Sequence, residues 1–344
     1  MRIAVDAMGG DNAPGEIVAG AVESLDLLNA EDTVWLFGPE EVVREELKRV
    51  KCKSDKIQVI DAPDIVGMSD SPVDSLKNKR KSSISLMAKM AGKNEVDAVI
   101  SAGNTGACVA ANQLRMRTLP SVHRPGISVV FPTFEGPVTV CDVGANIYCK
   151  PINLYQYAVM ASMQSKYVLG IENPRIGIMS IGEEDAKGNE TVKKARMMIK
   201  SDPNLNFIGN IEGRDIVGGV CDVVVCDGFV GNVILKMTEG LVDGLFKAIK
   251  HELMQEKIRL AMKFKPVMQR IYKKYDYNEY GGAPLLGING TALICHGSSK
   301  SRTIKNAVLA SKSYYNCKIN DKIVEYLSNT SIRTSDEQGS EVSG

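Results

Sequence analysis

The chain repeats one arrangement, in which a short apolar run ends at a polar, glycine-containing loop and an amphipathic segment follows. In residues 1–15 the apolar run ends at Asp6, two glycines follow, and Pro14 stands where a first helical turn begins. This order predicts a buried strand that leads through a loop into a helix N-terminus. In an open α/β sheet such junctions lie at the carboxyl ends of the strands, where ligands bind.

Strand-like and helix-like segments alternate along most of the chain. Apolar, β-branched runs predict strands at residues 2–5, 33–37, 57–60, 96–100, 127–131, 138–141, 176–181, 206–208, 222–226 and 290–295. Amphipathic segments predict helices at residues 14–28, 39–49, 84–92, 104–117, 151–167, 186–200 and 228–256. The alternation predicts a three-layer αβα fold with a mostly parallel sheet. Residues 118–142 hold two strands with no helix between them, so we expect a hairpin and an antiparallel part in the sheet.

Length and composition limit the class of protein. The chain has 344 residues and 44% hydrophobic content, enough for one α/β unit over residues 1–334, with two interlocked subdomains as an alternative. The net charge of +1 gives no global basis for binding nucleic acid. Eight cysteines without a CxxC pair indicate reduced thiols, and no apolar run reaches transmembrane length, so we expect a cytoplasmic protein. The polar residues 335–344 predict a disordered tail.

Five strand ends carry similar polar loops. They are Asp6 with the sequence GGDN, residues 101–106 (SAGNTG), residues 142–150 (DVGANIYCK), residues 182–190 (GEEDAKGNE) and residues 227–236 (DGFVGNVILK). Each alone can be an ordinary turn, because Gly and Asn commonly end strands. At the carboxyl edge of one parallel sheet, however, the five together predict a shared ligand site.

The residue types in these loops favour a small anion as the ligand. Helix N-termini combined with Asn, Thr and Lys suit a phosphate or another oxyanion. Residues 77–83 (KNKRKSS) add a basic cluster, for which a solvated surface is the alternative. His296 also follows a predicted strand and precedes a helix start, which makes it a candidate for the site. The sequence has no dinucleotide fingerprint, Walker A sequence, GxSxG elbow or clustered metal ligands, so we expect no cofactor and no bound metal.

A series of motifs along residues 1–315 resembles a known family. The motifs are DAMGGDNAP, SAGNTGA, DVGAN followed by CKP, IGEE with KGNE, IGNIEGRDI, CDGFVGNVILK, YGGAPLLG and HGSS. The set is similar to the bacterial acyl-carrier-protein:phosphate acyltransferase family (PlsX-type) of phospholipid synthesis. The resemblance implies conversion of an acyl thioester of acyl carrier protein and orthophosphate to acyl phosphate and free carrier. It also implies a homodimer with a fold similar to those of isocitrate/isopropylmalate dehydrogenase and phosphotransacetylase.

The resemblance gives the polar loops candidate roles. Phosphate is already an anionic nucleophile at neutral pH, so we expect direct attack on the thioester without an activated side chain. An acyl-enzyme on Cys149 is the alternative route. Candidates for substrate and phosphate binding are Asp6, Asn12, Ser101, Asn104, Thr105, Gly106, Asn146 and Asp227. Candidates for catalysis are His296, Asn189, Asn232 and Lys150.

Residues 241–278 form a separate amphipathic and basic region. Apolar residues repeat there at four-residue intervals from Leu241, and Pro266 is expected to separate two helices. Between residues 247 and 274 the net charge is +7. We expect a helical protrusion that packs in a dimer or contacts an anionic membrane or acyl carrier protein, which predicts a peripherally membrane-associated protein. The contact candidates are Lys257, Arg259, Met262, Lys263, Phe264 and Lys265.

Three other functions fit parts of the sequence. A phosphotransacetylase acting on acyl-coenzyme A would use the same chemistry with another carrier. A decarboxylating dehydrogenase of similar fold would need a metal triad and a nicotinamide loop, neither of which the sequence offers. A non-catalytic, membrane-associated scaffold that binds the carrier would have no need of the intact polar loops.

Overall fold

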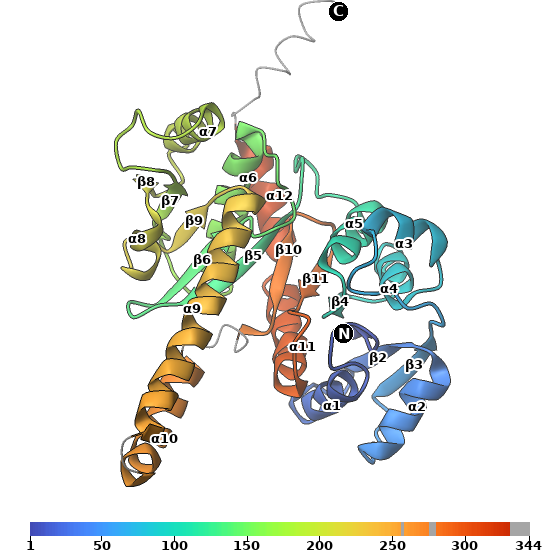
Figure 1. Cartoon of the computed structure of the whole chain (residues 1–344). Helices are drawn as coiled ribbons and strands as arrows, with labels where there is room; N and C mark the ends of the chain where they lie inside the picture. Colours follow the sequence, from blue (N-terminus) through green and yellow to red (C-terminus); the bar gives the residue numbers. More distant parts are fainter. Residues whose placement is uncertain (256–257, 275–279, 331–344) are drawn as a thin grey trace, which may run out of the picture.

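The computed structural model describes residues 1–255, 258–274 and 280–330. They form an eleven-stranded sheet with helices on both faces, which is the three-layer fold expected from the sequence (Figure 1). The strand order is β3-β2-β1-β4-β11-β10-β5-β6-β9-β7-β8. Strands from the first and last thirds of the chain therefore lie side by side near the middle of the sheet.

All ten predicted strands are present among the eleven strands of the described residues. The strands are β1 (Arg2–Asp6), β2 (Thr33–Gly38), β3 (Ile57–Asp61), β4 (Ala98–Ser101), β5 (Gly126–Pro132), β6 (Pro137–Cys141), β7 (Ile176–Met179), β8 (Phe207–Ile211), β9 (Val223–Val225), β10 (Ala283–Leu286) and β11 (Thr291–Ile294). The one strand that the sequence did not predict is β10. It is short, contains Pro284 and lies between glycines, which are all features that argue against a strand in sequence.

All seven predicted helices are also present among the twelve α-helices of the described residues. The helices are α1 (Gly15–Ser24), α2 (Glu40–Arg49), α3 (Pro72–Asn78), α4 (Ser83–Ala91), α5 (Thr105–Met116), α6 (Pro151–Tyr167), α7 (Glu190–Ser201), α8 (Gly213–Val217), α9 (Gly228–Gln255), α10 (Ile258–Lys274), α11 (Ser301–Asn316) and α12 (Ile319–Asn329). No helix of the described residues is both long enough and apolar enough to span a membrane.

The sheet has two parallel halves that run in opposite directions. Strands β3, β2, β1, β4 and β11 are parallel to one another, and so are β6, β9, β7 and β8. Between them the pairs β11–β10, β10–β5 and β5–β6 are antiparallel, which confirms the hairpin expected in residues 118–142. The expectation that all five strand ends face the same way is wrong, because β6, β7 and β9 run in the opposite direction to β1 and β4.

The core lies on both faces of the sheet. In β1, Ile3 and Val5 pack on one face and Ala4 packs on the other, as the alternation of a strand requires. Helices α1, α6, α11 and α12 cover the first face, and α4, α5 and the start of α9 cover the second. The last two helices pack against different halves of the molecule. Helix α11 packs against α1 in the N-terminal half, and α12 packs against α6, which follows β6.

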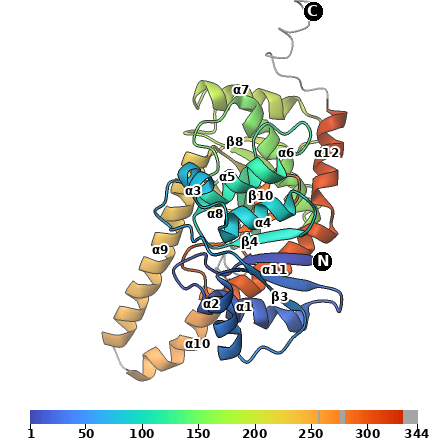
Figure 2. The ribbon, with the colours of Figure 1, turned by 90° about the vertical axis from the view of Figure 1, so that its right-hand side faces the viewer.

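Helices α9 and α10 form the expected protrusion. The second half of α9 projects away from the sheet, and α10 packs back against α9 (Figures 1 and 2). Pro266 lies inside α10, so the expectation that it separates two helices is wrong. Helix α10 begins at Ile258 and continues past Pro266, because an interior proline removes one helical hydrogen bond without ending this helix.

Candidate functional site

A cavity of about 120 Å³ lies over the antiparallel centre of the sheet, between α5 and α9. We call it the central cavity. Strands β5 and β11 line it through Ile127 and Ile294, and Thr105 lines it at the start of α5. Helix α9 supplies Asn232 and Lys236. The central cavity therefore combines residues from both parallel halves of the sheet.

A chain of hydrogen-bonded side chains lines the central cavity. Lys236 Nζ lies 2.9 Å from His296 Nε2 and 2.9 Å from Glu239 Oε2. On the other side of the imidazole, His296 Nδ1 lies 2.7 Å from Ser298 Oγ. Because an ammonium group only donates, His296 Nε2 accepts the bond from Lys236, and the main-chain nitrogen of Ser298 donates to His296 Nδ1 at 3.2 Å. Lys236 carries three donors and uses two here, which leaves one for an anion.

Helical spacing explains why α9 presents this set. Asn232, Lys236 and Glu239 are four and three residues apart, which places them on one face of the helix. The sequence places Asn232 and Lys236 in the fifth polar loop, but Lys236 has no assigned role there and Glu239 is not a candidate. The spacing of these polar residues along a largely apolar segment is the signal that could have identified Glu239. Among the described groups, Glu239 Oε1 is buried and has no hydrogen-bond partner.

Asp6 and Ser101 link the ends of the adjacent strands β1 and β4. The Asp6 carboxylate is buried and accepts hydrogen bonds from Ser101 Oγ at 2.6 Å and from the main-chain nitrogen of Met8 at 3.2 Å. Ser101 Oγ also accepts from the main-chain nitrogen of Gly103 at 3.0 Å. Burial raises the pKa of Asp6, and the hydrogen bond from Ser101 opposes that change. These contacts order the two loops, and binding of substrate by Asp6 or Ser101 stays a prediction.

Asn12 ties the first loop to the loop that presents His296. Its Nδ2 donates to the carbonyl oxygens of Ser298 and Ser299, each at 3.1 Å. The main-chain nitrogen of Asp11 donates to the carbonyl oxygen of Gly297 at 2.8 Å. Asn12 therefore positions the residues that directly follow His296.

The loop after β4 supplies Asn104, Thr105 and Gly106. Asn104 caps α5, since its Oδ1 accepts from the main-chain nitrogen of Ala107 at 3.0 Å, and its Nδ2 donates to main-chain oxygens of residues 67–70. A Cβ on Gly106 would lie 2.7 Å from Cγ of Pro72, so the absent side chain allows α3 to pack closely. Thr105 is the member of this group that lines the central cavity, and it lies in the first turn of α5, where the leading N–H groups have no partner within the helix.

Asn146 orders the loop after β6. It is buried, and its Nδ2 donates to the carbonyl oxygen of Pro125 at 2.6 Å and to the Tyr157 hydroxyl at 2.8 Å. Its main-chain nitrogen donates to Asp142 Oδ2 at 2.7 Å. Burial raises the pKa of Asp142, while hydrogen bonds from the loop backbone oppose that change. Asn146 thus holds its loop against α6 and the end of β6.

Asn189, Asp227 and Lys150 lie outside the central cavity. Asn189 Oδ1 caps α7 by accepting from the main-chain nitrogen of Val192 at 2.9 Å, and Asp227 Oδ1 accepts from that of Val230 at 2.8 Å. Asn189 and Asp227 both line a second cavity, which also borders α9. Lys150 is exposed at the start of α6. None of these three residues lines the central cavity beside His296.

The candidates for membrane or carrier contact lie in the protrusion. Met262, Phe264 and Lys265 are exposed in α10. The backbone also places Arg259 and Lys263 in α10. The remaining candidate, Lys257, lies outside the described residues.

The cysteines are free thiols, as the sequence predicts. Cys295 lines the central cavity, and burial raises its pKa to about 12. Burial likewise raises the pKa of Cys149 to about 11. Thiols with such pKa values are protonated at neutral pH and are poor nucleophiles. In the part of the chain that the structure describes, no group of three or more His, Cys, Asp and Glu side chains is arranged to hold a metal ion.

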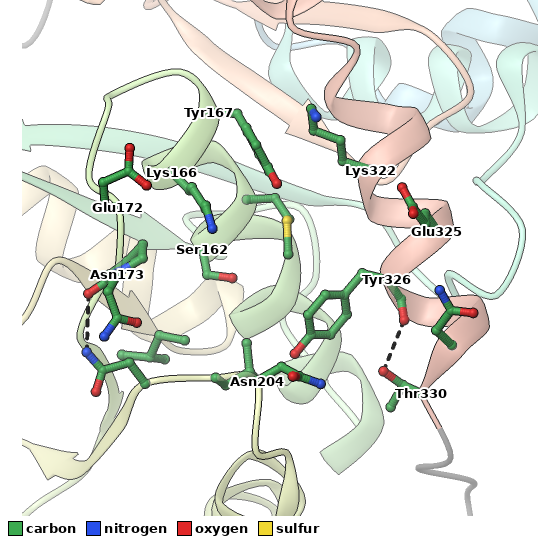
Figure 3. Close-up of a pocket in the computed structure, with 16 residues that line it drawn as sticks. Ser162, Lys166, Tyr167, Glu172, Asn173, Asn204, Lys322, Glu325, Tyr326 and Thr330 are labelled. Carbon is green, nitrogen blue, oxygen red and sulfur yellow. Dashed lines mark hydrogen bonds between the residues drawn. The ribbon is translucent and has the colours of Figure 1, made fainter.

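A larger cavity, of about 480 Å³, lies between α6 and α12 (Figure 3). Lys322 Nζ lies 4.0 Å from the centre of the Tyr167 ring there, and the Tyr326 hydroxyl donates to Asp202 at 2.9 Å. None of the predicted site residues lines this cavity. The candidate site is therefore the central cavity, where predicted residues from separate loops meet.

The sheet with its reversed halves is the fold of the phosphotransacetylases. A phosphotransacetylase from Streptococcus pyogenes aligns with a TM-score of 0.63 at 16% sequence identity, over 92% of this chain and 94% of that one. The EutD phosphotransacetylase from Staphylococcus aureus aligns with a TM-score of 0.60 at 14% identity, over 92% and 94% of the two chains. At these identities the likeness establishes the fold alone.

The chain belongs to the fatty acid synthesis protein family, whose model matches residues 1–322. A relative from Geotalea daltonii, named phosphate acyltransferase, is 45% identical over 332 residues, which cover 95% of this chain and 94% of the relative. These findings confirm the family resemblance that the motifs carry.

Proposed function

We propose that this chain is a phosphate acyltransferase that moves an acyl group from acyl carrier protein to orthophosphate. The products are acyl phosphate and a carrier with a free thiol. The observation that carries the proposal is the Lys236–His296 pair, which shares one cavity with the N-terminus of α5. The relative named phosphate acyltransferase supports the same reaction.

The geometry suits direct transfer. Lys236, Thr105 and the first main-chain N–H groups of α5 bind the phosphate anion. A phosphate oxygen attacks the thioester carbonyl carbon, so a carbon–oxygen bond forms and the carbon–sulfur bond breaks. Asn232 is placed to donate a hydrogen bond to the carbonyl oxygen, and the charge of Lys236 stabilises the negative charge that develops as the thiolate departs. Since phosphate is already ionised, these residues position and stabilise charge without having to create the nucleophile.

The raised pKa values of the nearby thiols favour this route over an acyl-enzyme. Attack by Cys295 or Cys149 would first require a thiolate in an environment that disfavours charge. Trapping an acyl group on Cys149, together with loss of turnover in Cys149→Ala, would contradict direct transfer.

The test is the formation of acyl phosphate, trapped as hydroxamate. Purified protein with palmitoyl-acyl carrier protein and orthophosphate should form hydroxamate and release carrier thiol in equal amounts. Palmitoyl-coenzyme A in place of the carrier thioester separates the proposal from a phosphotransacetylase, and NAD(P)H absorbance separates it from a dehydrogenase. A protein that binds the carrier but forms no acyl phosphate with either thioester would be a scaffold instead.

We further propose that the chain is a homodimer with α9 in the contact. An apolar stripe runs along this helix at four-residue intervals, and each of its side chains is 60–62% exposed in the single chain. A second copy would cover a surface that otherwise stays in water. The stripe consists of Met237, Leu241 and Leu245, beyond the end of α9 that borders the second cavity.

The tip of the protrusion fits an anionic membrane surface. Met262 and Phe264 are apolar and exposed, and Lys265 supplies positive charge beside them. We propose that residues 1–334 act as one cytoplasmic catalytic unit that associates peripherally through this tip. The protein should float with anionic vesicles at low salt, and Met262→Glu should reduce that binding. Equal behaviour with neutral and anionic vesicles would contradict the proposal.

A further inference from the structure

A second cavity, of about 340 Å³, lies on the other side of α9. We call it the apolar groove. The ends of the neighbouring strands β7 and β9 form part of it, and α6, α7 and the first turns of α9 complete it. Its size is within the range of about 300–1,000 Å³ that is typical of ligand sites. The apolar side chains that line it are Leu154, Ile178, Met179, Ile181, Val192, Val225, Phe229, Val230, Val233 and Ile234.

The lining indicates what the groove can hold. Its described lining residues include no Lys or Arg, so it offers no counter-charge to a phosphate group or a carboxylate. The polar lining residues are few, and Ser180 and Asp227 follow the adjacent strands β7 and β9. Ser180 Oγ is buried with no hydrogen-bond partner in the described structure. A mostly apolar groove with a small polar margin suits a hydrocarbon chain that carries one polar end.

The apolar groove and the central cavity share α9 as their common wall. Asn232 and Lys236 line the central cavity, whereas Val233 and Ile234 line the groove. A helix with its side chains is about 10–12 Å wide, so one substrate can reach both cavities by crossing it. Phe229, which lines the groove, is exposed and lies three residues before Asn232 on the helix. The crossing is therefore open to a substrate on the surface of α9.

We propose that the apolar groove binds the hydrocarbon chain of the acyl substrate while the thioester lies in the central cavity. This inference rests on the proposed function, because that function supplies the acyl chain. If the groove binds the hydrocarbon chain, the size of the groove determines which acyl chain lengths the enzyme accepts. Each methylene withdrawn from water contributes roughly a fourfold factor to affinity, so a groove shortened by a bulky residue should disfavour long chains selectively.

Gly213 provides a way to shorten the groove. It lines the groove at the start of α8, and a Cβ built on it meets no other atom within 4 Å. Gly213→Leu should therefore fill space without displacing neighbours. We expect the ratio of kcat/KM for palmitoyl- over octanoyl-acyl carrier protein to fall by about tenfold or more, with the octanoyl rate nearly unchanged. Val192→Phe, from the α7 side of the groove, should lower the same ratio and covers the case in which Gly213→Leu fails to fold.

Val217→Leu is the matched control. Val217 belongs to the same helix as Gly213 but is 66% exposed and does not line the groove. The control should keep the wild-type ratio. If both groove variants also keep it, or lose both chain lengths equally, the groove does not bind the chain, although the wild-type activity still stands. If wild-type protein forms no acyl phosphate from either thioester, the proposed function itself fails.

Discussion

At the scale of single residues, the candidate site divides into groups that face the central cavity and groups that hold the loops. Lys236, His296 and Thr105 line the cavity. Asp6 and Asn104 instead have their polar atoms in hydrogen bonds to neighbouring loops. A sequence motif contains both kinds of residue, and only the three-dimensional contacts separate them.

Replacement of Lys236 by methionine tests the anion site. Lys236→Met removes the ammonium group that lies 2.9 Å from His296, and a charged hydrogen bond contributes about 1.5–3 kcal/mol. We expect kcat/KM for phosphate to fall by roughly 10- to 100-fold, measured by hydroxamate trapping at varied phosphate concentration. Lys200→Met, on the exposed surface of α7, is the control and should behave as wild type. An unchanged phosphate dependence in Lys236→Met would remove this residue from the site.

At the scale of elements, the site depends on how closely α9 packs against the loop after β6. A Cβ on Gly231 would overlap the carbonyl oxygen of Asp142, which no side chain tolerates. Glycine at this position therefore sets the place of the helix. Asn232 and Lys236 follow on the same helix, so their positions in the cavity depend on this contact.

Gly231→Ala should move α9 away from that loop. We expect a loss of about 1–3 kcal/mol in the free energy of unfolding, as for other overpacked sites, and a fall in kcat at saturating substrate. Gly240→Ala on the same helix is the matched control, since its Cβ meets no atom within 4 Å, and it should be neutral or slightly stabilising. Urea unfolding and turnover check both, and a fully active, stable Gly231→Ala would show that the contact does not position α9.

The sequence predicts the elements well and their directions poorly. Periodicity located the ten strands because each is an apolar run between polar residues. It missed β10, and with it the antiparallel pairs that reverse half the sheet. The candidates His296, Asn232 and Thr105 do meet in one cavity, whereas Asn189 and Lys150 do not line it. Strand direction depends on pairing between distant segments, which local patterns do not encode.

At the scale of the whole molecule, buried charge joins the start of the chain to its last third. Asp32 is 3% exposed and accepts hydrogen bonds from Lys312 Nζ at 2.6 Å and from the amino group of Met1 at 3.0 Å. Burial alone would raise the pKa of Asp32, but these bonds outweigh it and lower the pKa to about 2. The folded protein thus favours the carboxylate more than the unfolded chain does.

This difference predicts how stability depends on pH. A carboxyl whose pKa is lowered by folding stabilises the protein above its unfolded pKa of about 4 and loses that contribution as the pH falls toward 2. The contribution is about 2 kcal/mol. Urea unfolding of Asp32→Asn should show lower stability than wild type at pH 6, with a difference that shrinks below pH 4. Asp26→Asn, at an exposed site, should follow the wild-type curve. A constant difference across this range would contradict the ionic origin.

The stripe on α9 predicts the oligomeric state. Leu241→Asp with Leu245→Asp puts charge on side chains that are about 60% exposed in the single chain, so the fold should survive. We expect the wild-type mass in light scattering to be that of a dimer and the variant mass to be half of it. Met197→Asp on α7, at 57% exposure, is the control and should remain dimeric. A wild-type protein that is monomeric at all concentrations would refute the proposed contact.

The place of β11 in the sheet has a consequence for biosynthesis. The ribosome makes β4 early, yet the strand that pairs with its free edge is β11, which emerges after the whole protrusion. Lys236 likewise precedes its partner His296 by 60 residues. Until the last strands arrive, a nascent chain exposes an unpaired strand edge that can recruit other chains. Enzyme activity and protection from aggregation are therefore acquired together, near the end of translation.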